Sequence, residues 1–433
     1  MNLNRIVKTS FLLFCFSATM HVSSAFALPT WGSNSIGDRY RPITSWMSRF
    51  SENPHIIASG SVQAAVDQCD DVVGVNKYCV VEINNDSVFP VTISRPRVKL
   101  VGIEGTIQNN GPDSGDWIEV TNNVSFVLIE GLNLQGRNAS DDYIAAIRIE
   151  GSKIRKVAVI NNSISNFKSQ SNAHAIAVYG TGGTSTTSIR HILIDGNTVH
   201  TMETGSSESI VVNGNVIRWA ISHNDIWDIN NIAIDAIGGE GTSPKRLVNG
   251  RYYPGRYDRA RYGFIEDNYV SDMSTANNPA YDNVESWAAA IYIDGGSSIN
   301  VRDNVVENSS WGYEIGAENC VITRNITIIG NSVIGSTFGD FLIGGYNDGG
   351  FSYRKANYNC DPDQTDDSQE GHGYVRHVTA RENSFESTAV QEDKILPQFR
   401  VWNTIIADDA IEPINADRSN GRAPGDQNAI RTN

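Results

Sequence analysis

Three carboxylates recur on one kind of short segment in the second half of this 433-residue chain. Asp235, Asp294 and Glu314 lie in the stretches AIDAIG, AIYIDG and GYEIGA, where apolar residues alternate with other types. Such alternation predicts a short β-strand with one buried face, and it places the three carboxylates on the outward face. Carboxylates that lie close together raise one another's pKa or bind a cation, so these residues are candidates for chemistry.

Two kinds of chemistry follow from such a cluster. If the strands stack about 4.8 Å apart, acids on nearby strands could act as general acid and as base or nucleophile in glycoside hydrolysis. Alternatively, Asp235, Asp294 and Glu314 could together bind Ca²⁺, which takes several oxygen ligands and would neutralise the carboxylate of a uronate sugar. A solvated acidic ridge is the alternative without a site.

Other side chains on the same segments extend the candidate site. Tyr292 shares a column with two of the carboxylates and joins the candidate catalytic set, whereas Tyr313 is expected to point into the core. Trp287 and Trp311 flank the cluster and are candidate substrate-binding residues. Secondary acidic candidates beside these strands are Glu208, Glu240 and Glu318.

The earlier segments of the same type carry less polar chemistry. Arg148, Glu150 and Tyr179 occupy outward positions there, but the acidic residues concentrate in the later segments. His174 and His223 could reach the outward face, and the pattern favours a turn or core role for each.

A basic, aromatic loop follows the Asp235 segment and reads GGEGTSPKRLVNGRYYPGRYDRARYG. Arg side chains can grip carboxylate or sulfate groups, and Tyr rings can stack on sugars. We expect Arg259 and Arg261 to act in catalysis, with a base from this loop abstracting the proton next to a uronate. Alternatively, the cations pair with the acidic ridge and order the loop. The expected substrate-binding residues of the loop are Arg246, Arg251, Arg256, Tyr252, Tyr253 and Tyr257.

A repeat specifies the elements that must position these side chains. An element of the form apolar-x-apolar-x-x-Asn-x-apolar recurs with gaps of 35, 27, 44, 36, 27 and 52 residues, and Leu132 occupies the Asn position in an earlier repeat. Strand, Asn-containing turn, strand and Gly-rich return describe one coil of a solenoid, whose stacked coils share one core. Aligned Asn side chains could hydrogen-bond along the stack. The repeated positions are Asn162, Asn197, Asn224, Asn268, Asn304, Asn331 and Asn383.

These repeats, with the Gln63-Ala64-Ala65 segment before the first coil, resemble the pectin lyase-like right-handed parallel β-helix superfamily over roughly Ser61 to Ala389. The resemblance implies an all-β right-handed parallel β-helix with a short N-terminal capping helix at 61–69. It also implies that substrate lies along the outward face of the AIYIDG-type strands. Because the superfamily includes lyases, hydrolases, epimerases, tailspikes and adhesins, the fold does not select a reaction.

The N-terminal segment of the chain predicts export. Residues 1–27 combine Arg5 and Lys8 with a short apolar run and an Ala25-Phe26-Ala27 cleavage pattern, as in a secretory signal peptide. We expect a secreted or periplasmic protein with an N-terminal extension at 28–60, the β-helix at 61–389 and a C-terminal cap or tail at 390–433. Cleavage of the signal would remove Cys15, and the four cysteines that remain in the exported chain predict two disulfides. Cys69–Cys79 and Cys320–Cys360 are the expected pairs, with other pairings open.

Composition restricts the partners. The chain has 34 Lys and Arg against 49 Asp and Glu, a net charge of −15 that argues against a nucleic-acid or anionic-membrane binder. The superfamily resemblance implies a polysaccharide partner, and we expect no membrane segment after signal cleavage. The first expected activity is β-elimination on an anionic, uronate-containing polysaccharide. The alternatives are a glycoside hydrolase that uses paired carboxylates and a non-catalytic polysaccharide-binding or adhesin-like solenoid.

Overall fold

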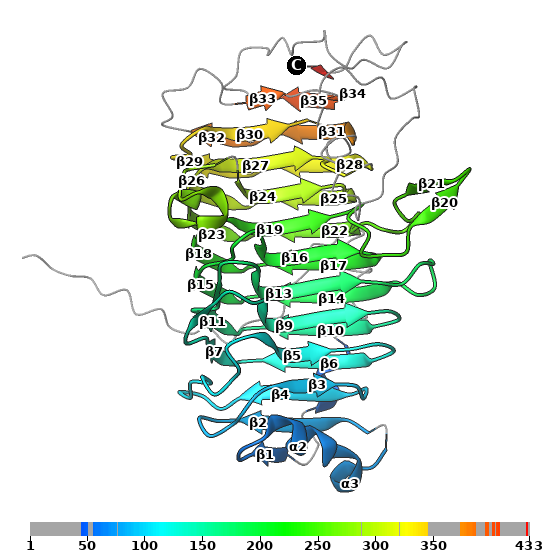
Figure 1. Cartoon of the computed structure of the whole chain (residues 1–433), viewed down its shortest axis with the longest axis vertical. Coiled ribbons are helices and arrows are strands. Elements are labelled where there is room, and N and C mark those ends of the chain that lie inside the picture. Colours follow the sequence, from blue (N-terminus) through cyan, green and yellow to red (C-terminus); the bar gives the residue numbers. More distant parts are fainter. Residues whose placement is uncertain are drawn as a thin grey trace, which may run out of the picture.

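The chain winds into coils that stack in a single column (Figure 1). The computed structural model describes residues 45–50, 55–75, 77–286, 288–319, 321–344, 373–386, 395–397, 401–402, 404–407 and 430–431. Each full coil contributes one strand to each of three long sheets, in which all strands pair in parallel. The predicted all-β parallel β-helix is therefore confirmed.

The three long sheets follow one another along each coil and are called sheets 1, 2 and 3. In spatial order, sheet 1 contains β3 (Val91–Ile93), β5 (Gly115–Val120), β9 (Ile144–Gly151), β13 (Ala173–Gly180), β16 (Glu208–Gly214), β19 (Ile232–Ile237), β24 (Ala289–Asp294), β27 (Trp311–Gly316), β30 (Gly339–Ile343) and β33 (Ile395–Pro397).

Sheet 2 receives the strand that follows each sheet 1 strand. Its members in spatial order are β1 (His55–Ala58), β2 (Cys79–Ile83), β4 (Val98–Gly102), β6 (Ser125–Glu130), β10 (Arg155–Ile160), β14 (Ile189–Asp195), β17 (Val216–Ser222), β22 (Arg261–Glu266), β25 (Ser297–Arg302), β28 (Ile322–Ile329), β31 (Tyr374–Arg381), β35 (Thr404–Ala407) and β36 (Ile430–Arg431), with β34 (Val401–Trp402) also paired to β31.

Sheet 3 completes the coil. It contains β7 (Asn133–Gln135), β11 (Ser163–Ser165), β15 (Thr198–Met202), β18 (Asp225–Ile229), β23 (Tyr269–Met273), β26 (Val305–Ser309), β29 (Ser332–Ile334) and β32 (Ser384–Glu386). The remaining described elements are short: β8 (Ala139–Ser140) with β12 (Lys168–Ser169), the antiparallel hairpin β20 (Arg246–Val248) and β21 (Arg251–Tyr253), and the 3-10 turns η1 (Met47–Phe50), η2 (Thr275–Asn277) and η3 (Pro279–Tyr281).

The core is built from columns of β-branched residues that the parallel register aligns. One column on sheet 1 joins Ile147, Ile176, Ile210, Ile234 and Ile291, each paired with the next and each fully buried. Branched side chains pack well on a pleated surface, and each coil buries its apolar face only against its neighbours. Because inward and outward residues alternate, this column fixes which residues reach the outer face of sheet 1.

The predicted asparagine stack is present between sheets 2 and 3. From Asn162 to Asn383, each amide nitrogen donates to the side-chain oxygen of the next asparagine at 2.9 Å. The same oxygen accepts the backbone N–H of the preceding asparagine, and Asn162 accepts the N–H of Leu132 at 3.0 Å. The ladder satisfies turn groups that would otherwise be buried without partners.

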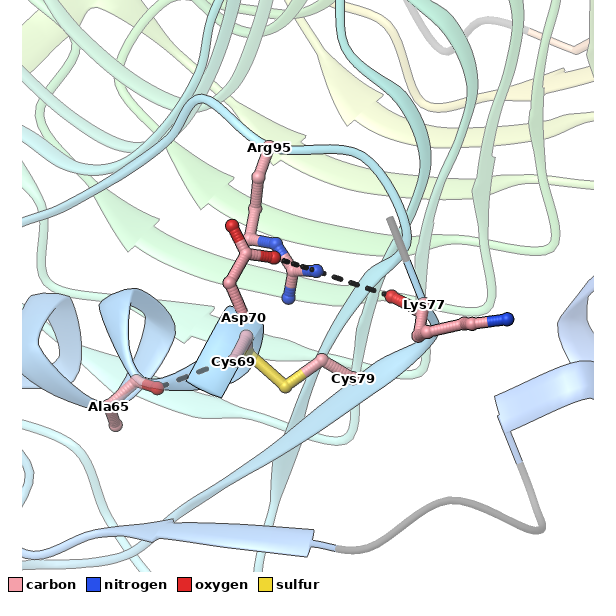
Figure 2. The surroundings of a disulfide bond; sticks show 6 residues. All are labelled: Ala65, Cys69, Asp70, Lys77, Cys79 and Arg95. Carbon is pink, nitrogen blue, oxygen red and sulfur yellow. Dashed lines mark hydrogen bonds and ion pairs between the residues drawn. A yellow bond between two sulfur atoms is a disulfide. The ribbon is translucent and has the colours of Figure 1, made fainter. Parts of the chain in front are cut away.

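A short helical cap covers the N-terminal end of the column. Ser61 caps α2 (Val62–Asp67), and the helix breaks at Gln68 before α3 (Cys69–Val73), so the predicted helix is present in two parts. A disulfide joins Cys69 to Cys79 at the start of β2, as predicted. Figure 2 shows Arg95 beside this bond. Its guanidinium contacts the Asp70 carboxylate at 2.8 Å and donates to the Lys77 carbonyl oxygen at 3.3 Å.

Strands on both sides of the expected 61–389 repeat region also join the long sheets. β1 precedes it in sheet 2, and β33 to β36 follow it in sheets 1 and 2. Parallel pairing uses the backbone, so a strand can extend the column without the asparagine signature. The segment 1–27 that was expected to be a signal peptide, Cys320 and Cys360 lie outside the described residues. No helix in the described ranges is long and apolar enough to cross a bilayer.

Candidate active site

The predicted carboxylate column lies on the outer face of sheet 1. Asp235 of β19 pairs with Tyr292 of β24, which pairs with Glu314 of β27, while Asp294 pairs with Gly316. Tyr313 alternates with these residues and is packed in the core, as expected. Although the three carboxylates face outward, they are only 2–4% exposed. The column is therefore covered by neighbouring side chains and loops.

Hydrogen bonds connect the later part of this column to the turn after β27. Asp294 accepts the backbone N–H of Glu318 at 2.8 Å and the Asn319 side-chain amide at 3.3 Å. The Tyr292 hydroxyl donates to the Glu318 carboxylate at 3.1 Å. The Tyr292 ring lies so close to Gly316 that a Cβ at that position would clash with it. A glycine is needed there because the ring occupies the space of a side chain.

Burial changes the ionisation of these carboxyls. Burial raises the pKa of Asp235, Asp294 and Glu314 well above the ordinary range, and the charge of Glu318 raises the pKa of Asp294 and Glu314 further. The neutral acid is therefore the favoured form of each group. In the described part of the chain, one carboxylate oxygen of Asp235 is buried without a hydrogen-bond partner. These acids present hydrogen-bonding groups rather than three fixed charges.

The predicted Ca²⁺ site can be tested against this arrangement. Ca²⁺ needs six to eight oxygen ligands that converge at about 2.3–2.6 Å. Among the described residues, no three or more Asp, Glu, His or Cys side chains are arranged to hold a metal ion. Asp235 and Glu314 are separated by the Tyr292 strand, and Asp294 is directed to the turn after β27. The residues do not fit a calcium site as they stand.

A cavity of about 330 Å³ opens on the same face of the molecule, over the earlier strands β9, β13 and β16. Two carboxylates, an arginine, a histidine and two tyrosines line it. The lining residues are Tyr143, Arg148, Asn172, His174, Tyr179, Ser206, Ser207, Glu208, Ile237 and Glu240. The cavity thus brings together two acids that the sequence pattern treated as secondary, Glu208 and Glu240.

Glu208 and Glu240 form the acidic pair of this cavity. Burial, followed by the charge of Glu240, raises the pKa of Glu208 to about 8. Glu240 reaches the surface, yet desolvation by its neighbours also raises its pKa, while a 2.6 Å hydrogen bond from the Asn213 amide favours its ionised form. Two acids in one site are thereby held in different environments, which suits them to different protonation states.

The root of the basic loop positions Glu240. Asp258 is fully buried and accepts the backbone N–H groups of Gly241 and Ser243, each at 2.8 Å. The Thr242 hydroxyl donates to the Asn213 side-chain oxygen at 2.8 Å. Because these bonds fix the backbone directly after Glu240, the loop holds this carboxylate over the outer face of β16.

Aromatic rings and a histidine form the other side of the cavity. The Arg148 guanidinium lies 4.9 Å from the Tyr143 ring and 5.2 Å from the Tyr179 ring, and it pairs with Glu150. His174 is buried, and its Nδ1 donates to the Glu208 carbonyl oxygen at 2.7 Å. Its Nε2 is then free to accept from the Tyr179 hydroxyl at 3.3 Å. Burial lowers the pKa of His174 to about 4, so the ring is neutral.

Arg259 and Arg261, the expected catalytic cations, are not among the residues that line this cavity. Arg259 donates to the carbonyl oxygen of Ile322 at 2.9 Å. Arg261 begins β22 in sheet 2, is 9% exposed, and donates to the side-chain oxygen of Asn215 at 2.7 Å and to two loop carbonyls. Their hydrogen bonds tie the loop to the coils, in line with the alternative of an ordering role.

The expected substrate-binding residues are likewise dispersed. The hairpin β20–β21 projects from the column (Figure 1). At the base of the hairpin, Arg246 donates to the Pro254 carbonyl oxygen and lies opposite Tyr253 in the antiparallel pair of strands. Arg256 lies over the Tyr257 ring, and Trp311 is 1% exposed in a small cluster with Ala289 and Leu342. Trp287 and the side chains of Arg251 and Tyr252 lie outside the described set.

The sequence pattern could identify some of the cavity residues but not others. Arg148 and Tyr179 occupy outward strand positions and could be found by alternation, and Glu208 and Glu240 stood out as neighbouring acids. Tyr143 and the serines at 206–207 come from turns, where no period assigns a direction. His174 was expected to have a core or turn role; it is buried but lines the cavity.

Sequence comparisons with known proteins find a relative for about half of the chain. No protein-family model matches the chain. Over 226 residues the chain is 37% identical to "Uncharacterized protein YwoF" of Bacillus subtilis (strain 168), covering 51% of this chain and 44% of that protein. It therefore spans less than half the length of this relative.

Solved structures show the same architecture at low sequence identity. The exopolygalacturonase of Thermotoga maritima is similar with a TM-score of 0.50 and 10% identity, covering 86% of this chain and 91% of that one. The alginate lyase of Paenibacillus sp. str. FPU-7 is similar with a TM-score of 0.48 and 11% identity, covering 80% and 99%. At this identity the likeness to the former establishes the fold and no activity.

Proposed function

We propose that this pectin lyase-like right-handed parallel β-helix is a carbohydrate-active enzyme that hydrolyses a polysaccharide in the cavity over β9, β13 and β16. Glu208 is the general acid, and Glu240 is the second carboxylate. One observation carries the proposal: both residues line the same cavity, and the charge of Glu240 contributes to raising the pKa of Glu208 to about 8.

The proposed roles follow from this difference in environment. Protonated Glu208 donates to the leaving glycosidic oxygen, while ionised Glu240, stabilised by Asn213, activates water or attacks as a nucleophile. Tyr143 and Tyr179 provide ring faces against which a sugar can pack. Neither the proton transfer nor the attack in this proposal uses Ca²⁺.

Charge favours a neutral sugar chain over the anionic one expected from the sequence. Arg148 is already paired with Glu150, and the cavity also contains Glu208 and Glu240. A row of uronate carboxylates would meet the charge of ionised Glu240 at an electrostatic cost. The acids Asp235, Asp294 and Glu314 continue the same face as neutral, almost completely covered groups, so they add no positive charge that would attract an anionic chain.

A second candidate function, β-elimination on a uronate polymer, rests on the His174–Tyr179 pair. Tyr179 donates to neutral His174 and lies beside Arg148. In this alternative, Arg148 binds the uronate carboxylate. Tyr179 passes its proton to His174 Nε2, takes the proton from the reacting carbon and gives it to the leaving oxygen, after which His174 returns the proton to Tyr179. Export is part of the proposal for either reaction, because a disulfide persists in oxidising compartments and the N-terminus reads as a signal peptide.

A screen of neutral and uronate-containing polysaccharides tests the proposal. The wild type should release new reducing ends from a neutral polymer without the absorbance of an unsaturated uronate, and a chelator should not change the rate. Glu208→Gln and Glu240→Gln should each lower the rate by about 10²-fold or more. An absorbing product would favour elimination instead. Binding without any cleavage would favour the adhesin-like alternative.

A further inference from the structure

A second cavity of about 230 Å³ lies at the corner between sheets 3 and 1. The strands β15, β18 and β23 and the turns that follow them form it. Its lining residues are Lys168, Thr201, Met202, Glu203, Asp228, Ile229, Asn230, Asp272, Ser274 and Asn277. Glu203 lines this cavity, whereas Ser206 and Ser207 line the first one, so a single turn separates the two.

Asn230 gives this second cavity an unused donor. It is 9% exposed, and its side-chain oxygen accepts the backbone N–H of Thr204 at 2.7 Å. Its amide nitrogen is buried and has no hydrogen-bond partner among the described residues. A buried donor without a partner is costly, so an acceptor on a bound molecule would stabilise this arrangement.

The remaining lining groups indicate what kind of molecule that is. Lys168 pairs with Glu203 at 2.6 Å, and Asp228 and Asp272 add two further carboxylates, so an anion is disfavoured. No three acidic, His or Cys side chains in the described ranges are arranged to hold a metal. The wall thus mixes donors and acceptors with the apolar edge of Met202, as a hydroxyl-rich molecule requires.

An aromatic step adjoins the cavity on the outer face of sheet 3. Thr201 and Asp228 have left-handed backbone conformations, with φ of 55° and 56°. This conformation turns two successive side chains of each strand outward, so His200 and Trp227 lie beside these lining residues. The two rings are stacked, with centroids 4.7 Å apart and planes at 4°. The apolar face of a sugar ring can pack on such a step.

We propose that this cavity and the His200–Trp227 step form a second, non-catalytic binding site for a neutral sugar unit. The ligand class rests on the proposed function, but the site shares no residue with the hydrolytic cavity. Asn230 donates to a sugar oxygen, Asp228 and Asp272 accept from hydroxyls, and Trp227 supports the ring.

Nuclear magnetic resonance of the Trp227 indole N–H gives a readout specific to this site. The full chain carrying Glu208→Gln, which should lower the rate of turnover by about 10²-fold or more, is titrated with cellohexaose, laminarihexaose, mannohexaose and xylohexaose. The indole signal is assigned by its loss in Trp227→Phe. At least one of these sugars should shift it, and Asn230→Asp should weaken that binding about tenfold because it keeps the acceptor for Thr204 and removes the donor.

Asn283→Asp is the matched control, since it adds the same charge at an exposed position outside the cavity. Its affinity should equal that of the parent, and both variants should melt at the parent's temperature. An indole signal that no sugar moves, or that reports equal affinity in Asn230→Asp, overturns the second site. The proposed hydrolysis is judged separately, from the reducing ends released by protein with an intact Glu208.

Discussion

Glu208 differs from the other acids of the sheet 1 face because it opens into a cavity that also contains a second carboxylate. Asp235 and Glu314 have raised pKa values too, but they are almost completely covered. A proton donor must be both protonated and reachable by the leaving group. This combination singles out Glu208 as the acid.

Removing the charge of Glu240 should lower the pKa of Glu208. In Glu240→Gln, the Coulombic contribution that raises the Glu208 pKa towards 8 is lost, so the carboxyl should titrate at lower pH. Carboxyl ¹³C resonances followed against pH measure this shift, with the Glu208 signal assigned by Glu208→Gln. Glu119→Gln removes a charge three strands away in sheet 1 and should leave the titration unchanged. An unchanged Glu208 pKa in Glu240→Gln would contradict the proposed pair.

The sequence predicted the position of individual side chains only where strand alternation determined whether they face inward or outward. Alternation with the coil repeat correctly placed Asp235, Tyr292 and Glu314 in one column. The partners of Arg259 and Arg261 could not be read this way, because Ile322 and Asn215 are brought to them by other coils. The cavity depends on turn residues, whose positions are set by tertiary contacts rather than by period.

At the scale of elements, the asparagine ladder is the feature that the sequence specified best. Identical residues at one turn of every coil can only stack if the coils are in register, and the spacing therefore predicted both the turn and its hydrogen bonds. The basic hairpin shows the opposite case. Its basic and aromatic composition was conspicuous. However, no sequence pattern predicted that β20–β21 projects from the column or that the root of the loop places Glu240 at the cavity.

An alanine in the middle of the ladder should cost more stability than one at its end. Asn224→Ala removes the acceptor for Asn197 and leaves the donors and acceptors of two coils unpaired, so we expect a loss of about 2–4 kcal/mol. Asn383→Ala serves as the control, because Asn383 is the last member of the described ladder and bonds only to the preceding side. Urea unfolding followed by circular dichroism gives both values. Equal losses would contradict a cooperative ladder.

For the whole molecule, the uneven distribution of charge matters more than the total of −15. The column buries several acids on one face, while a hairpin that carries Arg246 and Arg251 projects from it. The sequence predicted one long solenoid with an acidic face, because coils stack without a limit on core size. The sequence pattern could not predict which of these acids are buried, because their burial depends on how the loops cover the face.

This burial predicts how stability depends on pH. The folded-state pKa values of Asp235, Glu314 and Glu208 are raised above those of the unfolded chain. Their contribution to stability is therefore fully present below the ordinary carboxyl pKa and is lost as pH rises through the raised values, which is about 8 for Glu208. Between about pH 6 and about pH 9, Asp235→Asn/Glu314→Gln should lose less unfolding free energy than the wild type. Parallel curves for the two proteins would count against buried, neutral acids.

The role of Glu208 as proton donor can be measured most directly by comparing two leaving groups. A polysaccharide leaving group needs protonation, whereas a dinitrophenolate does not. Glu208→Gln should therefore lose about 10²-fold or more on the polysaccharide that the wild type cleaves, while retaining most of its activity on the dinitrophenyl glycoside of the same sugar. Equal rates for variant and wild type on both substrates, or an equal loss on both, would contradict the assignment of Glu208 as the general acid.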